Sequence, residues 1–335
     1  GSEGWRDLEQ DLDGAQQSVF DDSGCWRLFE LRYLAFRYQA HACFSLLPDR
    51  QLYTSLFQWR FRQRNVEQQH SARQVVLLLR RRSDFPVLVM KKAIVIGATS
   101  GIGRETAARL VEEGWMVGVT GRRVEALKSF KAEYGDNVHF MEMDVTKEDA
   151  TVGLDELIGE MGAPDLLLYV SGVGYQNLEL DMDKEIRTVK TNCEGLVRMV
   201  VHFINYVRNH QELYSADHEA HIAVVTSIAG TAGLGTAPSY SATKKMQQTY
   251  ISALTQLVRM EGLPVSFTDI RPGFVATAIL NPNKQYPMMM SLEKAADEVI
   301  KAIRRKKRIY TFDWKFRILV FFWSLVPRFI WERLT

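Results

Sequence analysis

The stretch KKAIVIGATSGIG, residues 91–103, decides the fold of this chain. Its short apolar run, residues 93–96, is typical of a buried strand, and glycines then lead straight into a segment of helical period. Glycines let the backbone turn tightly and let a pyrophosphate approach the first N–H groups of the helix, where the helix dipole favours an anion. A glycine-rich turn between a strand and a helix therefore predicts a dinucleotide site.

The alternation of strands and helices continues along the chain. Apolar runs predict strands at 116–121, 138–145, 165–172, 221–229, 265–273 and 308–312, and helical period predicts helices at 103–114, 122–135, 181–208, 237–261 and 291–304. Continuous apolar strands between helices imply a parallel sheet covered on both faces. We therefore predict an α/β fold, a doubly wound parallel sheet (Rossmann fold), in which ligands bind beyond the carboxyl ends of the strands.

The composition indicates one main globular domain in a reducing compartment. The chain has 335 residues, 46% of them hydrophobic, which allows a substantial core. Its three cysteines and seven histidines show no metal-ligand or redox spacing, so we expect neither disulfides nor a metal site. No run of eighteen apolar residues and no signal-peptide pattern occurs, which favours a cytoplasmic protein without a transmembrane span.

The first 89 residues differ in composition from the rest. They contain twelve arginines but no lysine and no methionine, and Met90 is the first of the twelve methionines. We interpret Met90 as the native start and residues 1–89 as a foreign, fused or misread segment. The alternative is a genuine N-terminal extension of unknown role. The expected organisation is thus this segment, a Rossmann domain at 90–312 and a helical tail at 313–335.

Two arginines follow the second predicted strand, where an acidic residue would bind the ribose hydroxyls of NAD. A guanidinium fits a phosphate, so Arg122 and Arg123 favour NADP over NAD. The alternative is a solvated start of the next helix, which would account for Arg123 in particular.

The stretch SYSATKK, residues 239–245, places a tyrosine four residues before a lysine on a predicted helix. Tyr240 and Lys244 then share one helix face, which in isolation is an ordinary surface pair. A hydride added to a carbonyl carbon leaves negative charge on the oxygen, which must gain a proton. We expect Tyr240 to supply it, with Lys244 and the positive ring of an oxidised nicotinamide lowering the tyrosine pKa from about 10.

These stretches together resemble the short-chain dehydrogenase/reductase family, over residues 90 to about 280. Further family motifs occur in order: MDV at 143–145, TVKTN at 188–192, VVTSIAG at 224–230 and RPGFVAT at 271–277. The resemblance implies a catalytic tetrad of Asn192, Ser227, Tyr240 and Lys244. It also implies that Ser227 donates a hydrogen bond to the substrate oxygen, and that Asn192 holds a water that passes protons out through Lys244.

The resemblance further implies that NADP(H) is held at the carboxyl edge of the sheet. The implied cofactor residues are Gly97, Thr99, Ser100, Gly101, Ile102, Gly103, Arg122, Arg123, Asp144, Val145, Ser171, Gly172, Tyr240, Lys244, Pro272, Gly273, Val275 and Thr277. One position departs from the family, because YVSG at 169–172 stands where members commonly read Asn-Asn-Ala-Gly. Tyr169 must leave the hydrogen bonds of that asparagine, which help to tie the sheet together, to another group.

The C-terminal tail is a separate electrostatic unit. The net charge is −7 over residues 90–300 and +8 over residues 301–335. A basic cluster precedes an aromatic-rich helix that is too short to span a bilayer. The polar stripe of this helix consists of Asp313, Arg317, Ser324 and Arg328. The helix either lies in the interface of an anionic membrane or packs on its own domain or on a second subunit.

The substrate site should be lined by residues 173–176, 231–238 and 279–290, which follow the fourth, fifth and sixth strands. Met288, Met289 and Met290 would adapt to an apolar substrate, or else simply pack beneath a loop. The membrane interpretation favours a lipid-like ketone over a sugar.

The sequence thus predicts an NADP(H)-dependent oxidoreductase that interconverts a small-molecule carbonyl and a secondary alcohol. By the resemblance it forms a homodimer or homotetramer through the helices at 181–208 and 237–261. The alternative function is a non-catalytic sensor or scaffold that binds NADPH and docks through its tail, against which the intact tetrad argues. A nucleic-acid role is not expected, because residues 90–300 are net acidic.

Overall fold

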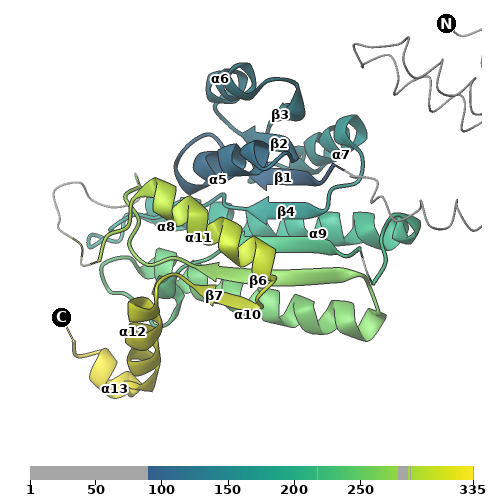
Figure 1. Cartoon of the computed structure of the whole chain (residues 1–335). Helices are drawn as coiled ribbons and strands as arrows, with labels where there is room; N and C mark the ends of the chain where they lie inside the picture. Colours follow the sequence, from purple (N-terminus) through teal and green to yellow (C-terminus); the bar gives the residue numbers. More distant parts are fainter. Residues whose placement is uncertain (1–89, 217, 278–285, 287, 335) are drawn as a thin grey trace, which may run out of the picture. The chain divides into compact units, whose positions relative to one another are not determined.

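The centre of the protein is a twisted parallel sheet (Figure 1). The computed structural model describes residues 90–216, 218–277, 286 and 288–334. The proposed N-terminal segment 1–89, and most of 279–290, lie outside these described residues. The strands are β1 (Lys92–Ile96), β2 (Met116–Gly121), β3 (Val138–Glu142), β4 (Leu166–Tyr169), β5 (Ala220–Val225), β6 (Val265–Arg271) and β7 (Ile309–Thr311). Their order in the sheet is β3-β2-β1-β4-β5-β6-β7, which confirms the predicted doubly wound α/β fold.

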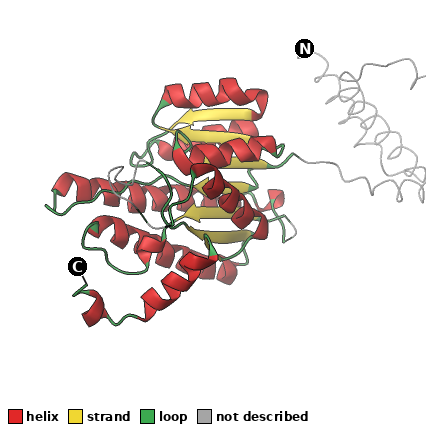
Figure 2. Cartoon of the chain, turned by 60° about the vertical axis from the view of Figure 1, so that its left-hand side comes forward, coloured by secondary structure: helices red, strands yellow, loops and turns green. Residues whose placement is uncertain are grey.

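Helices cover both faces of the sheet, as Figure 2 shows. One face carries α5 (Gly101–Glu112), α6 (Val124–Tyr134) and α11 (Leu292–Arg305), and the other carries α7 (Ala150–Met161), α9 (Gly195–Asn209) and α10 (Pro238–Glu261). Alternate side chains of β1 enter the two cores: Ala93 and Val95 pack toward α5, and Ile94 and Ile96 pack toward α9. A strand buried on both sides needs the continuous apolar run that its sequence has.

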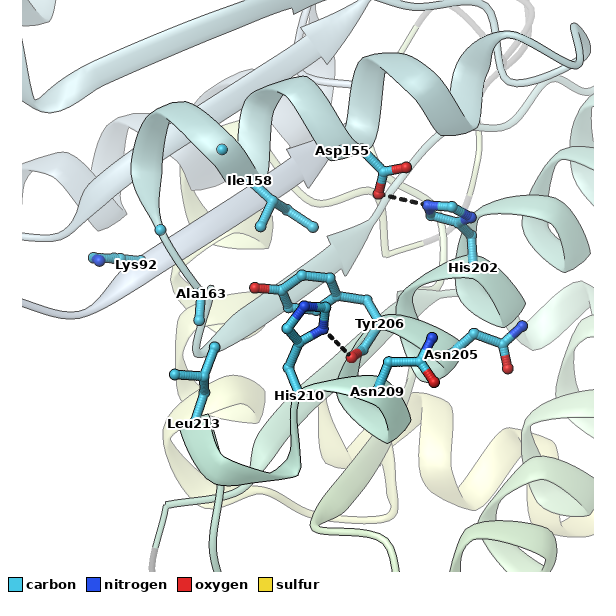
Figure 3. A pocket seen from close by; sticks show the side chains of 12 residues that line it. Lys92, Asp155, Ile158, Ala163, His202, Asn205, Tyr206, Asn209, His210 and Leu213 are labelled. Carbon is cyan, nitrogen blue, oxygen red and sulfur yellow. Dashed lines mark hydrogen bonds and ion pairs between the residues drawn. The ribbon is translucent and has the colours of Figure 1, made fainter.

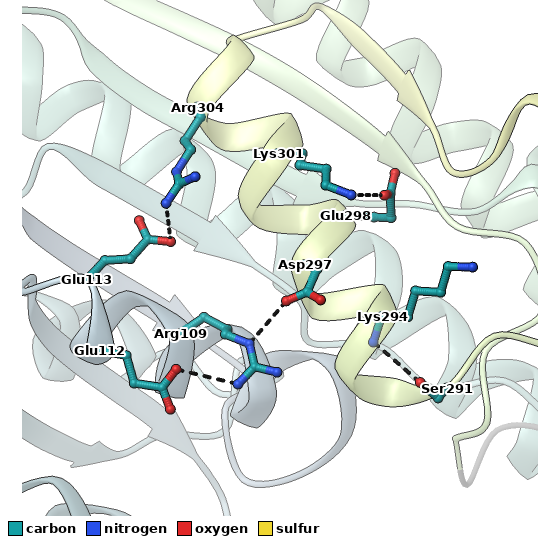
Figure 4. Close-up of polar contacts among 9 residues, drawn as sticks. All are labelled: Arg109, Glu112, Glu113, Ser291, Lys294, Asp297, Glu298, Lys301 and Arg304. Carbon is teal, nitrogen blue, oxygen red and sulfur yellow. Dashed lines mark hydrogen bonds and ion pairs between the residues drawn. The ribbon is translucent and has the colours of Figure 1, made fainter.

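Helix α11 lies beside α5 and crosses it through both apolar and charged contacts (Figure 4). Arg109 on α5 pairs with Asp297 at 3.1 Å, and Arg304 pairs with Glu113 at 2.7 Å. These charged groups are solvent-accessible, so each pair contributes little to stability. Burial of apolar residues such as Val299 between the helices fixes α5, and with it the glycine turn at its start.

The predicted helix at 181–208 is interrupted. It consists of α8 (Met182–Val189), a π-helical turn (Lys190–Glu194) and α9. Single π turns inside α-helices are frequent at functional sites. The insertion turns the expected catalytic residue Asn192 into the interior, where its side chain is fully buried.

The C-terminal tail forms α12 (Trp314–Leu325) and α13 (Arg328–Trp331), close to the predicted positions, with Pro327 as the N-cap of α13. The preceding basic cluster lies elsewhere, because Arg304 and Lys306 pair with Glu113 and Glu219 at the amino edge of the sheet. Strand β7 then carries the chain back to the carboxyl edge, where α12 starts. The basic cluster that precedes the aromatic helix in the sequence is therefore separated from it in space by β7. Within the described ranges, no helix has both the length and the apolar character needed to cross a bilayer.

Candidate active site

The turn after β1 is built so that only glycine fits. Gly97 has φ +95°, and a Cβ there would lie 2.7 Å from the backbone nitrogen of Ser171. A Cβ on Gly103 would lie 2.2 Å from the carbonyl oxygen of Gly97. Gly101, with φ +59°, has open space beside it, and a Cβ there would come nearest to Thr277, at 3.9 Å. The turn is therefore tightly packed at Gly97 and Gly103 and open at Gly101, the first residue of α5.

The first turn of α5 suits an anion. Its N-cap, Ser100, makes no side-chain capping bond, and the first turn contains no acidic residue. The N–H groups and the positive helix end are thus available to a phosphate. Ile102, in the same turn, packs partly against the core. These residues fit the pyrophosphate of a dinucleotide.

Arg123 lies directly beside this turn. Its guanidinium donates to Thr99 Oγ1 at 2.8 and 3.2 Å and to Ser100 Oγ at 2.6 Å. It is therefore more than a solvated helix start. Arg122 instead lies near Asp144. Burial raises the pKa of Asp144, but hydrogen bonds from Thr146 and the charge of Arg122 together outweigh burial, so the pKa lies below its ordinary value. Between the two arginines, Arg123 is the one held at the glycine turn.

Tyr169, the departure from the family pattern, ends β4 inside the core. Its ring is fully buried and its hydroxyl donates to the carbonyl of Thr191 at 3.2 Å. A Cβ on Gly195 would lie 3.1 Å from this hydroxyl and 2.6 Å from a methyl of Val145, so glycine makes room for both. The tyrosine thus ties the sheet to the π turn directly.

Asn192 holds the loop that follows β4. Its Oδ1 accepts from the Val173 N–H and its Nδ2 donates to the Val173 carbonyl, both at 2.8 Å. The same Nδ2 donates to Thr243 Oγ1 at 3.0 Å. A Cβ on Gly172 would lie 3.3 Å from Asn192 Oδ1, so the loop with Ser171 and Gly172 runs close against it. The amide thus ties the loop after β4 to the π turn and, through Thr243, to α10.

Ser227, Tyr240 and Lys244 come together at the carboxyl ends of β4 and β5. Ser227 follows β5 and accepts a hydrogen bond from the Ala229 N–H at 3.1 Å. A hydrogen bond with Ser227 lowers the pKa of Tyr240, but burial of the phenol has the larger effect and raises it. The expected lowering of this pKa by Lys244 is therefore not what the protein's own groups produce. The tyrosine is held as the neutral phenol.

Lys244 is buried below the tyrosine ring, with Nζ 5.8 Å from the ring centroid. Nζ donates to the Val225 carbonyl and to Gln247 Oε1, each at 3.1 Å. Burial lowers the pKa of Lys244 to about 8, although the charge of Asp269 opposes this shift.

Gln247 is a site residue that the sequence did not reveal. It is fully buried one turn after Lys244, and its Nε2 donates to the Asn192 carbonyl at 2.7 Å. The Gln247 amide therefore connects Lys244 to Asn192, the two residues that the resemblance links through a water. The only signal in the sequence is a glutamine three residues after the lysine, on the same helix face.

The loop after β6 closes the site on one side. Pro272 and Val275 are buried, the Pro272 carbonyl accepts from the Ile228 N–H at 3.1 Å, and Val275 pairs with Met290. A Cβ on Gly273 would lie 2.3 Å from the ring of Phe316 on α12. The tail therefore packs against the predicted cofactor loop.

The three predicted methionines separate in the structure. Met290 is buried in the core beside α11, whereas Met288 and Met289 are exposed. Of the three, Met288 and Met289 remain candidates for substrate contact.

A surface pocket of about 850 Å³ lies away from all these residues, between the ends of α7 and α9 (Figure 3). Its polar lining includes His202, paired with Asp155 at 2.7 Å, and His210, whose ring stacks on Tyr206. It contains none of the predicted site residues and lies toward the amino edge, beside Lys92 at the start of β1.

This fold and this constellation define a class. The family model described as short chain dehydrogenase matches residues 91–287. The chain belongs to the short-chain dehydrogenase family, and it is a dehydrogenase or reductase acting on CH–OH and C=O groups.

Individual relatives support this assignment. An uncharacterized oxidoreductase from Myxococcus xanthus is 30% identical over 68% of this chain and 89% of its own length. The NADP-dependent 3-hydroxy acid dehydrogenase YdfG from Escherichia coli is 30% identical over 54% of this chain and 71% of its own. The solved structure of a 3-ketoacyl-(acyl-carrier-protein) reductase from Brucella melitensis, complexed with NADH, superimposes with a TM-score of 0.60, covering 67% of this chain and 96% of that one. At 21% identity, that likeness shows the fold alone.

Proposed function

We propose that this protein is an NADP(H)-dependent oxidoreductase that reduces a lipophilic ketone to a secondary alcohol, with Tyr240 as the acid. The observation that carries the proposal is the placement of Tyr240 beside Ser227 and above the buried Lys244, at the carboxyl edge and on the side of the glycine turn. A surface tyrosine and lysine pair would need none of this burial.

Each side chain has a defined task. When bound, the nicotinamide cofactor supplies the hydride. Ser227 donates a hydrogen bond to the carbonyl oxygen, and the Tyr240 hydroxyl gives its proton to that oxygen as negative charge develops there. Because burial raises the pKa of Tyr240, the hydroxyl is protonated at neutral pH, which suits the reducing direction. The Lys244 ammonium stabilises the phenolate that remains.

The preference for NADP is supported by Arg123. Its guanidinium lies on Thr99 and Ser100, where a phosphate on the adenosine ribose would meet a fixed positive charge. One relative, YdfG, is NADP-dependent by name. We expect Arg123→Ala to weaken NADPH binding by about tenfold or more and to leave NADH binding nearly unchanged.

Cofactor binding to the full chain, measured by calorimetry, tests this preference. Lys128→Ala is the matched control, since Lys128 lies on the adjoining helix α6, is exposed and pairs only with Glu125 among the described residues. An equal loss of NADH and NADPH affinity in Arg123→Ala would contradict the preference.

The catalytic proposal is tested by following NADPH absorbance with a panel of ketones. Tyr240→Phe should lower kcat by about a thousandfold or more while NADPH still binds, because it removes only the hydroxyl. Tyr250→Phe, on the same helix α10, should retain activity. Cofactor binding without turnover of any ketone, aldehyde or alcohol would instead identify a binding protein.

A further inference from the structure

The two C-terminal helices carry a continuous set of exposed apolar side chains. The most exposed are Trp314, Ile318, Phe321, Phe322, Leu325 and Phe329, each between 48% and 62% accessible. On the opposite side of α12, Phe316 is buried. One side of α12 thus packs on the domain and the other side is uncovered. The packed side fits the interpretation that the tail packs on its own domain, and the uncovered side is free for a membrane or a second subunit.

The packed side holds the C-terminal helices next to the loops of the expected substrate site. The ring of Phe316 packs on Gly273 and lies 6.2 Å from the ring of Phe274. Trp323 and Trp331 lie 5.1 Å apart, and Trp331 Nε1 donates to the Gly233 carbonyl at 2.6 Å. The tail is therefore held by the loops that follow β5 and β6.

A second group of exposed apolar side chains adjoins the same loops. Leu178 and Leu180 before α8, and Met182 at its first position, are 64–77% accessible. Asn177, directly before Leu178, donates its N–H to the carbonyl of Thr236, three residues from Gly233. Exposed apolar side chains thus occur both on the C-terminal helices and on the segment that is bonded to the loop after β5.

The charges flanking this surface are mostly positive. Lys315, Arg317, Arg328 and Arg333 lie on or beside the two helices, against two acidic residues, Asp313 and Glu332. Glu332 is occupied by Arg328 at 2.6 Å, and Asp313 caps α12 by accepting from the Lys315 N–H. A second copy of the chain would bring like charges together at this face, whereas an anionic surface is complementary to it.

We propose that α12 and α13 seat the protein on the interface of an anionic phospholipid bilayer, with Phe322 and Leu325 entering the headgroup region. Aromatic and aliphatic side chains flanked by Lys and Arg are the residues that such an interface accepts. Because the same helices pack on the loops after β5 and β6, the substrate entrance then faces the bilayer. The substrate is a ketone dissolved in the membrane; this last step rests on the proposed function.

Co-sedimentation of the full chain with vesicles tests the seating. Vesicles of equimolar phosphatidylcholine and phosphatidylglycerol should bind the protein about tenfold or more tightly than phosphatidylcholine alone, and high salt should weaken this binding. The double substitution Phe322→Ser and Leu325→Ser should reduce binding by more than about tenfold, since both side chains are exposed and their loss leaves the domain packing intact. Met260→Ser, equally apolar and 77% accessible on α10, is the matched control and should bind as the wild type.

Absence of binding to the anionic vesicles, or undiminished binding of the double variant, would overturn the proposal. A wild-type oligomer that binds no vesicles and dissociates in the double variant would assign this face to a second copy. Vesicle binding needs no turnover, so its failure is distinct from failure of the proposed reaction. An active wild type should reduce a vesicle-embedded ketone faster than the double variant does, while both reduce a short soluble ketone equally.

Discussion

The Nζ of Lys244 donates a hydrogen bond to Oε1 of Gln247 at 3.1 Å, four-fifths of a turn along the same helix. Gln247 also bonds to the π turn, because its Nε2 donates to the carbonyl of Asn192 at 2.7 Å. One uncharged side chain thus joins α10 to the π turn, which holds the loop after β4. All three residues are buried, so none of these polar groups can turn to bulk water.

Replacing Gln247 by leucine should therefore destabilise the protein. Gln247→Leu removes the acceptor of the Lys244 ammonium and the donor to the Asn192 carbonyl, and leaves both partners buried. We expect a loss of about 1–3 kcal/mol in the free energy of unfolding, measured by urea denaturation, and a shift in the pH profile of activity. Gln256→Leu, exposed on the same helix, should cost less than about 0.5 kcal/mol. Equal stability of the two variants would remove Gln247 from the network.

The low pKa of Lys244 predicts a pH dependence of stability. Burial lowers this pKa from 10.5 to about 8, so between these values the unfolded chain binds more protons than the folded one. The stability of the wild type should therefore rise with pH in this window, and the penalty for burying the charge is fully present only below about pH 8. Relative to Lys244→Met, the free energy of unfolding of the wild type should increase by about 1 kcal/mol per pH unit between pH 8 and 10.

Urea denaturation of both proteins across that range measures the difference. The comparison removes the contribution of the buried tyrosines, which both proteins share. A difference that stays constant with pH would mean that Lys244 titrates alike in the folded and unfolded states.

Gly174 should be required for the position of Tyr240. A Cβ at residue 174 would lie 2.6 Å from Cδ2 of the Tyr240 ring, so Gly174→Ala must displace either the ring or the loop. We expect kcat to fall by about 10- to 100-fold, since small displacements of a reacting group are costly. NADPH binding should change much less. Gly159→Ala on α7, where nothing lies within 4 Å of the added methyl, is the control for activity. Full activity of Gly174→Ala would show that this contact is readily relieved.

Gly273 and Phe316 should be coupled. A methyl at residue 273 meets the Phe316 ring at 2.3 Å, so either the ring or the loop must shift to accept it. Gly273→Ala should cost about 1–3 kcal/mol in the free energy of unfolding and increase proteolysis within α12. Adding Phe316→Leu should restore part of this loss, because the smaller side chain makes room for the methyl. Additive costs in the double variant would contradict a direct contact. Gly235→Ala, with open space around it, should be neutral.

Local patterns in the sequence were sufficient for the fold, whereas the tetrad came from the resemblance and stays a prediction. Apolar runs flanked by glycines specify strands and turns through short-range sterics and side-chain period, so β1, the turn with Gly97 and Gly101, and the Tyr240–Lys244 spacing could all be predicted.

The contacts that the sequence did not predict depend on packing between distant segments. The sequence does not reveal that Gln247 meets Asn192, 55 residues away, or that the Tyr169 hydroxyl reaches the carbonyl of Thr191. The sequence also does not reveal that burial raises the pKa of Tyr240 in the protein alone, because this effect depends on the segments that fold around the phenol.

The sequence by itself determined the parallel sheet, the glycine turn and the residue types of the site, since each of these is specified within one or two turns of chain. Only the tertiary structure decided which arginine lies at that turn, that the basic cluster and α12 occupy opposite edges of the sheet, and which face of α12 is left uncovered. The reason is that these depend on where β7 returns the chain and on how Phe316 fits against Gly273, and no local period encodes the meeting of two segments.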